Sequence, residues 1–307
     1  MRYQITHQTA YIYSEPVALA PHMLRLRPRS DANQQLHRFD LSIEPAPVGQ
    51  SAMIDLDGNS IHKVWFSDTP VSELLITTVS EVETLCTNPF AYLLDPWAVN
   101  LPPAYSDSPP LGLQPYLAGY LSKIPGAIDP VAAQLAQEVW YEVSGNTVAF
   151  LSTLNQRIYE HCGYTIRETG GPFPPGVTWT KKSGSCRDVS VLFMEACRAM
   201  GLAARFVSGY QEGDVDTNDR HLHAWAEVYL PGAGWRGFDP THGLAVSDRH
   251  IALVACPHPQ DAAPITGTLL KGGVRSQMTY TLKITGHEPT EVTGDRQTTS
   301  SLTQQQS

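Results

Sequence analysis

The amino-acid sequence predicts an α+β protein, in which an N-terminal antiparallel β-sandwich-like domain precedes helices packed on a second antiparallel sheet. Three observations support this fold class. Apolar and polar side chains alternate in segments of residues 1–98, as in half-buried strands. Residues 99–116 are rich in Pro and Ser and lack periodicity, which is typical of a linker. Beyond them, apolar residues recur at helical spacing before further strand-like segments.

Within residues 1–98, the strand pattern is clearest at 37–43 and, more loosely, at 74–82. Between these segments, Asp57-Gly58 predicts a hairpin turn, because both residue types tolerate a positive φ angle. Turn-forming pairs with Pro recur at short intervals on either side. Short strands separated in this way are typical of an antiparallel β-sandwich.

Helices are expected in the second half of the chain. Asp129 is an N-cap residue followed by Pro130 at the first helical position, and apolar residues then recur at four-residue spacing. Two further apolar stripes, each followed by a glycine, predict helices over residues 148–162 and 186–200.

Strand-like segments follow the helices at residues 203–210, 223–230 and 234–239, with one more at 277–285. The polar residues 287–307 are expected to form a disordered tail. We therefore divide the chain into a β domain at 1–98, a linker at 99–116, a second domain at 117–286 that includes the C-terminal strand, and the tail at 287–307.

Composition excludes several classes of protein. The 21 Lys and Arg against 30 Asp and Glu give a net charge of −9, which argues against nucleic acid or an anionic membrane as partner. No segment resembles a secretory signal or reaches the ~18 uninterrupted apolar residues of a membrane span. Five cysteines without a C-x-x-C pair argue against a disulfide framework. We expect a cytoplasmic protein with free thiols, and the sequence does not indicate its oligomeric state.

Cys186 is the cysteine most suited to nucleophilic chemistry. It lies at the first turn of a predicted helix, where unpaired backbone N–H groups and the positive end of the helix dipole favour a thiolate. The same N–H groups suit an oxyanion formed on a substrate carbonyl. The alternative is that Cys186 is a small buried residue at the helix start, an interpretation that fits Cys197 better because Cys197 lies on the apolar stripe.

A nucleophilic cysteine needs a base and a group that orients the base. His223, Trp225 and Glu227 share one face of a predicted strand, and a Gly-rich turn leads into the next strand, which ends at Asp239. If the turn carries a one-residue bulge, Asp239 lies diagonal to His223 on that face, within reach of a side-chain hydrogen bond. Cys186, His223 and Asp239 are therefore candidate catalytic residues.

The segments G-S-C-R-D at 184–188 and H-A-W-A-E-V-Y-L-P-G-A-G-W-R-G-F-D-P-T at 223–241 resemble the bacterial transglutaminase-like superfamily, over roughly residues 130–260. The segment A-A-R-F-V-S-G-Y at 203–210 is similar to the strand between them, and the N-terminal residues resemble the small β domain that precedes this core in many bacterial members. The resemblance implies that residues 117–286 form a papain-like catalytic core. It assigns Cys186 as nucleophile, His223 as general base and acid, and Asp239 as the residue that orients the imidazole.

The resemblance implies a cysteine amide hydrolase that acts on a peptide or isopeptide substrate through a thioester and needs no cofactor. The alternatives are a protein cross-linking transglutaminase and a non-catalytic binding module. Trp179, Asp188 and Trp225 are candidate substrate-binding residues, with Trp179 also a candidate partner for the oxyanion. Asp188 is equally favourable as an acidic residue that supports the helix start, and Trp225 as a residue of the core or of the cleft wall.

Metal sites are expected to be absent. His221, His223, Asp239 and His242 resemble a histidine–carboxylate metal set, but the family resemblance explains two of them without a metal. Residues 214–216 contain two aspartates but lack the spacing of a calcium loop, so we expect a solvated loop there.

Overall fold

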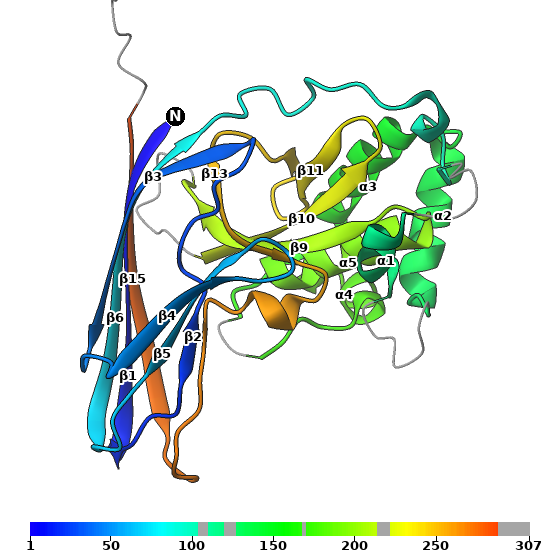
Figure 1. Cartoon of the computed structure of the whole chain (residues 1–307). Coiled ribbons are helices and arrows are strands. Elements are labelled where there is room, and N and C mark those ends of the chain that lie inside the picture. The colour runs from blue at the N-terminus through cyan, green and yellow to red at the C-terminus, as the bar shows by residue number, and fades with distance from the viewer. Residues whose placement is uncertain (104–109, 120–126, 168–169, 214–221, 288–307) are drawn as a thin grey trace, which may run out of the picture.

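A computed structural model of the chain describes residues 1–103, 110–119, 127–167, 170–213 and 222–287 (Figure 1). The expected tail at 287–307 falls almost wholly outside these residues, and the segment 214–216 does so entirely. In the described part of the chain, no helix has both the length and the apolar character needed to cross a membrane.

The N-terminal domain is an antiparallel β-sandwich, as the sequence predicts. Its two sheets have four strands each, in the orders β15-β1-β6-β3 and β14-β2-β5-β4. Asp57-Gly58 lies in the turn between β4 and β5, and Gly58 has φ 78°. Apolar side chains of both sheets, among them Leu24, Val64 and Leu74, are buried between the sheets. The strands are β1 (Arg2–Val17), β2 (His22–Leu24), β3 (Gln34–Glu44), β4 (Gly49–Ile54), β5 (Ser60–Trp65), β6 (Val71–Thr84), β14 (Ile265–Thr266) and β15 (Ser276–His287).

The C-terminal strand belongs to this sandwich, so its assignment to the domain at 117–286 was wrong. β15 pairs with β1 from Arg2 opposite His287 to Tyr13 opposite Ser276, and the two strands run side by side in Figure 1. Alternation along residues 277–285 indicates a strand but carries no information about its partner. β15 pairs with β1 and thereby forms the outer strand of this four-stranded sheet.

The second domain packs helices on a five-stranded antiparallel sheet, in the order β12-β11-β10-β9-β13. Its strands are β9 (Ala204–Gln211), β10 (Leu222–Leu230), β11 (Gly234–Asp239), β12 (Leu244–Ala245) and β13 (His250–Cys256). Its main helices are α2 (Pro130–Glu142), α3 (Thr147–His161), α4 (Pro175–Lys181) and α5 (Cys186–Ala199). The short elements of the chain are η1 (Pro96–Ala98), η2 (Leu111–Leu113), α1 (Gln114–Leu117), β7 (Gly163–Tyr164), β8 (Ser183–Gly184) and η3 (Pro259–Ala262).

α5 is the central helix of this domain, because every residue from Asp188 to Arg198 is buried. It packs on β10, whose side chains Ala224, Ala226 and Val228 belong to the same apolar core as Leu192 and Phe193 of the helix. The expected cap is present on α2, where the Asp129 carboxylate accepts hydrogen bonds from the N–H groups of the first turn. The three helices that the sequence predicts are therefore confirmed, whereas α4 and β13 were missed.

The described ends of the linker are packed rather than free. Leu101 is buried, and its carbonyl accepts a hydrogen bond from Trp140 Nε1 at 2.9 Å. Leu113 is also buried. The Pro-rich composition at 99–116 therefore identifies a segment without long elements, and Leu101 anchors this segment to the core of the helical domain.

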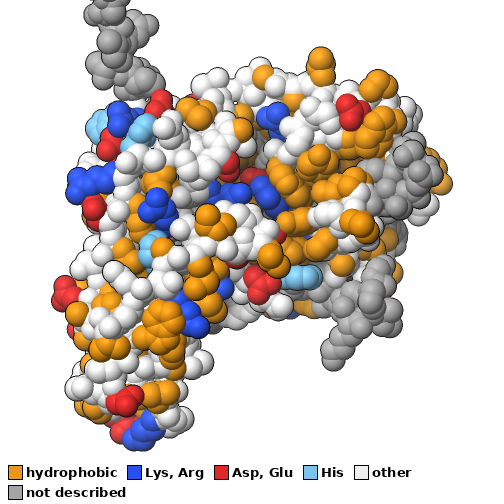
Figure 2. Space-filling view, in the orientation of Figure 1, with side chains coloured by type: hydrophobic (Ala, Val, Ile, Leu, Met, Phe, Trp, Pro, Cys, Tyr) orange, Lys and Arg blue, Asp and Glu red, His pale blue; other side chains and the backbone are white. Residues whose placement is uncertain are grey.

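The two domains share an apolar core. Tyr3, Ile5 and Val82 of the sandwich belong to the same buried cluster as the helices and β9. Buried polar contacts add to this interface, and His7 Nδ1 lies 3.0 Å from the Tyr210 hydroxyl. On the face seen in Figure 2, acidic and basic side chains of the described residues are interspersed, without one continuous basic surface. The sandwich therefore packs against the five-stranded sheet through apolar and polar contacts.

Candidate active site

Cys186 is the first residue of α5, and a capping box fixes its position. Ser185 is the N-cap residue, and its backbone N–H and its hydroxyl both donate to Asp188 Oδ2 at 2.8 Å. In return, the Ser185 side chain accepts from the backbone N–H of Asp188. Cys186 itself is neither fully buried nor fully exposed. The sequence therefore presents this thiol at the start of the helix, next to N–H groups at its positive end.

Asp188 holds the helix start together instead of facing substrate. Its side chain is fully buried, and Oδ1 accepts from Phe173 N at 2.7 Å and from Arg167 at 2.6 Å. Burial alone would raise the pKa of Asp188, but its hydrogen bonds outweigh burial and lower it. Both carboxylate oxygens of Asp188 are occupied by these hydrogen bonds. The structure therefore supports the role of Asp188 at the helix start and does not support direct contact with substrate.

Replacing Asp188 with Ala is expected to destabilise the fold by about 3 kcal/mol or more, because it leaves Arg167 and several donors without their buried acceptor. Urea unfolding followed by circular dichroism measures this change. Asp40→Ala is the matched control, because Asp40 pairs with Arg38 at an exposed site and should change stability by less than about 1 kcal/mol. Similar losses in the two variants would contradict the role of Asp188.

His223 and Asp239 come together through the register of β10 and β11. Ala226 lies opposite Phe238 and Leu230 opposite Gly234, so residues 231–233 form the turn. Continuing the register by one residue places Asp239 opposite Trp225 and therefore diagonal to His223. The predicted diagonal arrangement is confirmed, and His223 Nε2 lies 2.8 Å from Asp239 Oδ2.

The electrostatics of this pair favour an ionised site. Burial disfavours the charged imidazole, but the Asp239 carboxylate and the hydrogen-bonded Cys186 side chain raise the pKa of His223 to about 10. Burial would also raise the pKa of Asp239, yet the histidines around it hold that pKa well below its usual range. Because Nε2 of His223 is occupied by Asp239, Nδ1 is the nitrogen available to the thiol. The structure thus brings the three candidate catalytic residues together.

The raised pKa of His223 predicts a pH-dependent contribution to stability. A group whose pKa rises on folding stabilises the fold fully below its unfolded value of about 6.5 and loses that effect towards pH 10. The difference in unfolding free energy between the wild type and His223→Gln should therefore shrink as the pH rises from 6.5 to 10. Urea titrations across this range measure it, and a difference that grows with pH would contradict the arrangement.

Two more histidines, His242 and His250, lie within hydrogen-bond distance of the same carboxylate oxygen. His242 Nδ1 lies 2.9 Å and His250 Nε2 lies 3.1 Å from Asp239 Oδ2. His242 is partly exposed, whereas His250 is buried. His250 begins β13, the edge strand on the far side of β9, so no local pattern in the sequence connects it with Asp239.

Among the described residues, His223, Asp239 and His250 are also a set that could hold a metal. Each offers one ligand atom, and these atoms lie within 4.8 Å of one another. Zinc takes such ligands at about 2.0–2.2 Å. Here the two histidine nitrogens lie at hydrogen-bond distance from the Asp239 carboxylate, so an ion between them would separate His223 from Asp239. His221, which the sequence analysis considered with this set, lies outside the described residues.

The two candidate tryptophans differ in position. Trp225 is 1% exposed and packs over Gly209, where a Cβ would lie 2.6 Å from the indole ring. The prediction that Trp225 binds substrate is therefore wrong, because the ring is sealed between the sheet and the N-terminal domain. Trp179 on α4 is half-buried, and the Lys182 ammonium lies 3.0 Å from its ring centre.

Tyr164 is a residue near the thiol that the sequence analysis missed. It is exposed, and its strand β7 runs parallel to β8, with Tyr164 opposite Gly184, two residues before Cys186. Partial burial and then the nearby Cys186 raise the pKa of Tyr164. An exposed aromatic side chain beside the thiol is suited to contact a substrate.

Comparisons with known proteins agree with this architecture. Residues 3–83 match the bacterial transglutaminase-like N-terminal region, and residues 133–240 match the transglutaminase-like superfamily. An uncharacterized protein of Mycobacterium tuberculosis is 29% identical over 94% of this chain and 93% of its own. A protein-glutamine gamma-glutamyltransferase of Pseudomonas aeruginosa is 31% identical over 38% of this chain and 19% of its own. A proposed cysteine protease from Cytophaga hutchinsonii has the same fold, with a TM-score of 0.70 and 18% identity over 94% of this chain and 92% of its own.

Proposed function

The chain belongs to the transglutaminase-like superfamily, and from that premise we propose that it is a cysteine-dependent amide hydrolase acting on peptide or isopeptide bonds. The observation that carries the proposal is the placement of His223, which bonds Asp239 through Nε2 and interacts with Cys186. A nucleophile, a base and a group that orients the base are the parts that covalent acyl transfer needs.

In the proposed reaction, His223 takes the proton of the Cys186 thiol, and Asp239 stabilises the resulting imidazolium. The thiolate attacks the amide carbonyl, and the backbone N–H groups at the start of α5 stabilise the oxyanion. The C–N bond then breaks as His223 gives its proton to the leaving amine, and an acyl thioester remains on Cys186. His223 next takes a proton from water, the hydroxide attacks the thioester, and the acid product leaves as the thiol is restored.

The acceptor of the acyl group separates hydrolysis from transfer. A second candidate function is protein-glutamine acyl transfer to an amine, which is favoured by the similarity of 38% of this chain to the Pseudomonas aeruginosa enzyme. Both reactions share the thioester and differ in whether water or an amine attacks it. A non-catalytic binding module would form no thioester.

Incubation with a glutamine-containing peptide, an isopeptide and a fluorescent primary amine distinguishes these functions. We expect ammonia release or peptide cleavage in excess of amine incorporation, with both lost in Cys186→Ala. Amine incorporation without excess hydrolysis would contradict the proposed hydrolase and support the transferase. Absence of both products, and of an acyl adduct on Cys186 by mass spectrometry across a broad amide panel, would leave the binding module.

A further inference from the structure

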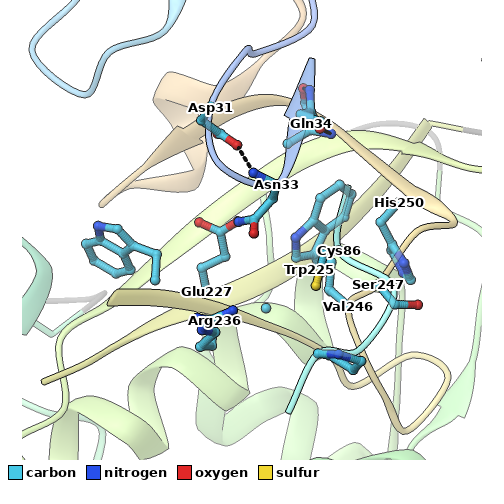
Figure 3. Close-up of a pocket in the computed structure, with 14 residues that line it drawn as sticks. Asp31, Asn33, Gln34, Cys86, Trp225, Glu227, Arg236, Val246, Ser247 and His250 are labelled. Carbon is cyan, nitrogen blue, oxygen red and sulfur yellow. Dashed lines mark hydrogen bonds between the residues drawn. The ribbon is translucent and has the colours of Figure 1, made fainter. Parts of the chain in front are cut away.

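A small cavity of about 40 Å³ lies between the catalytic sheet and the N-terminal domain (Figure 3). Trp225 and His250 line it from the sheet, and Asn33 and Gln34 line it from the sandwich domain. His250 therefore lines the cavity and also contacts a candidate catalytic residue, because its Nε2 atom lies 3.1 Å from Asp239 Oδ2. His250 thus connects the cavity with Asp239.

Two buried side-chain atoms of residues that line the cavity have no hydrogen-bond partner among the described residues. They are Nε1 of Trp225 and Nδ1 of His250. The rings meet edge to face, with centroids 5.2 Å apart. Indole Nε1–H is a donor. Asp239 is an ionised acceptor, so the proton of neutral His250 must sit on Nε2, which leaves Nδ1 as an acceptor.

Both atoms are buried, so the tautomer of His250 is set by its contact with Asp239. The form with the proton on Nε2 is the one that donates to this carboxylate.

The N-terminal domain also fixes the backbone that carries His250. Gln34 Nε2 donates to the Ala252 carbonyl at 2.9 Å, and Ala252 N donates to Gln34 Oε1 at 2.7 Å. The pairing of β13 with β9 shifts register between Ala252 and Val254, so the Gln34 amide bonds the backbone where the ladder is irregular. The sandwich domain therefore holds β13 two residues after His250.

We propose that His250 is a positioning residue for the reaction, held as the Nε2–H tautomer by Asp239 and held in place by the contact of Gln34 with β13. The proposal rests on the proposed function. His250 donates to the carboxylate oxygen that His223 also uses, so it fixes Asp239 in the orientation that holds the imidazolium. With its proton on Nδ1 instead, His250 would turn a lone pair towards that oxygen and repel it. The N-terminal domain is thereby required for the catalytic geometry.

The test compares His250→Leu and His250→Gln in the full chain. Iodoacetamide labelling of Cys186, followed by peptide mass spectrometry from pH 5 to pH 10, measures how the thiol responds. In His250→Leu, we expect the rate at neutral pH to fall by about 10-fold or more, and the onset of reactivity to move to higher pH. His250→Gln should restore much of the rate and of the profile, because its side-chain amide can donate to Asp239. Nitrogen-15 NMR of the wild type should show His250 protonated on Nε2 only.

A matched pair of substitutions tests the role of the N-terminal domain. Gln34→Leu removes the two bonds to Ala252, while Asn59→Leu removes an equivalent pair to Ala255, three residues farther along β13. We expect comparable losses of stability, but only Gln34→Leu should slow the labelling of Cys186. Equal rates in these two variants would contradict the contribution of Gln34.

The outcomes separate this inference from the proposed function. A folded His250→Leu with the wild-type rate and pH profile overturns the inference and leaves the proposed function intact. If His250→Leu does not fold, His250→Gln and the NMR spectrum decide, and a proton on Nδ1 of wild-type His250 overturns the inference. Cys186 in the wild type reacting no faster than Cys197 removes the proposed function itself.

Discussion

Replacing Cys186 with Ala is expected to lower kcat/KM for amide hydrolysis by about 10⁴-fold or more, because no other group can form the thioester. Cys186 is neither fully buried nor part of the capping box bonds, so the fold should keep nearly its wild-type stability. Initial rates with the cleaved substrate, together with urea unfolding of the same preparations, measure both quantities.

Cys197→Ala is the control for this substitution. Cys197 is 0% exposed in the middle of the apolar face of α5, and burial raises the pKa of its thiol well above the usual value. Its loss should reduce stability through lost packing while the activity of the folded enzyme remains. Activity retained in Cys186→Ala and lost in Cys197→Ala would exclude Cys186 as the nucleophile.

Asp239→Asn is expected to lower kcat/KM by about 10²- to 10⁴-fold, because the carboxylate that orients and stabilises the imidazolium is gone. The effect reaches beyond His223, since His242 and His250 bond the same oxygen. A neutral amide in this place loses the ionic attraction in either orientation, and in one of them its N–H groups also face the three imidazoles. Stability should also fall, most clearly at neutral pH, where the His223–Asp239 ion pair is formed.

Asp55→Asn provides the matched control, because Asp55 accepts hydrogen bonds from Asp57 and Asn59 within the sandwich domain. We expect this variant to keep its activity. Steady-state kinetics should show a loss mainly in kcat for Asp239→Asn, since the carboxylate acts on the imidazolium and not on bound substrate. A change confined to KM would contradict the assigned role of Asp239.

Local signals in the sequence predicted much of the fold and the middle of the site. Asp129 with Pro130, and the glycines after the helices, gave correct helix positions because caps act within one turn. The Gly-rich turn between the strands at 223–230 and 234–239 indicated a hairpin, and an assumed one-residue bulge placed Asp239 diagonal to His223. The register itself comes from the pairing of β10 with β11.

The features that sequence could not supply depend on contacts between distant segments. β15 alternates like any strand, and its pairing with β1 joins the two ends of the chain. Trp225 has the pattern of a residue facing a cleft, but the N-terminal domain covers that face. His250 begins an apolar strand and reaches Asp239 across the width of two intervening strands, β9 and β10. Each depends on tertiary packing, which periodicity does not encode.

The reactivity of Cys186 towards iodoacetamide at neutral pH tests its proposed role as the nucleophile. We expect Cys186 to be labelled faster than the buried Cys197 by orders of magnitude, and we expect His223→Ala to abolish most of this difference. A Cys186 that reacts no faster than Cys197, at a rate unaffected by His223→Ala, would contradict it.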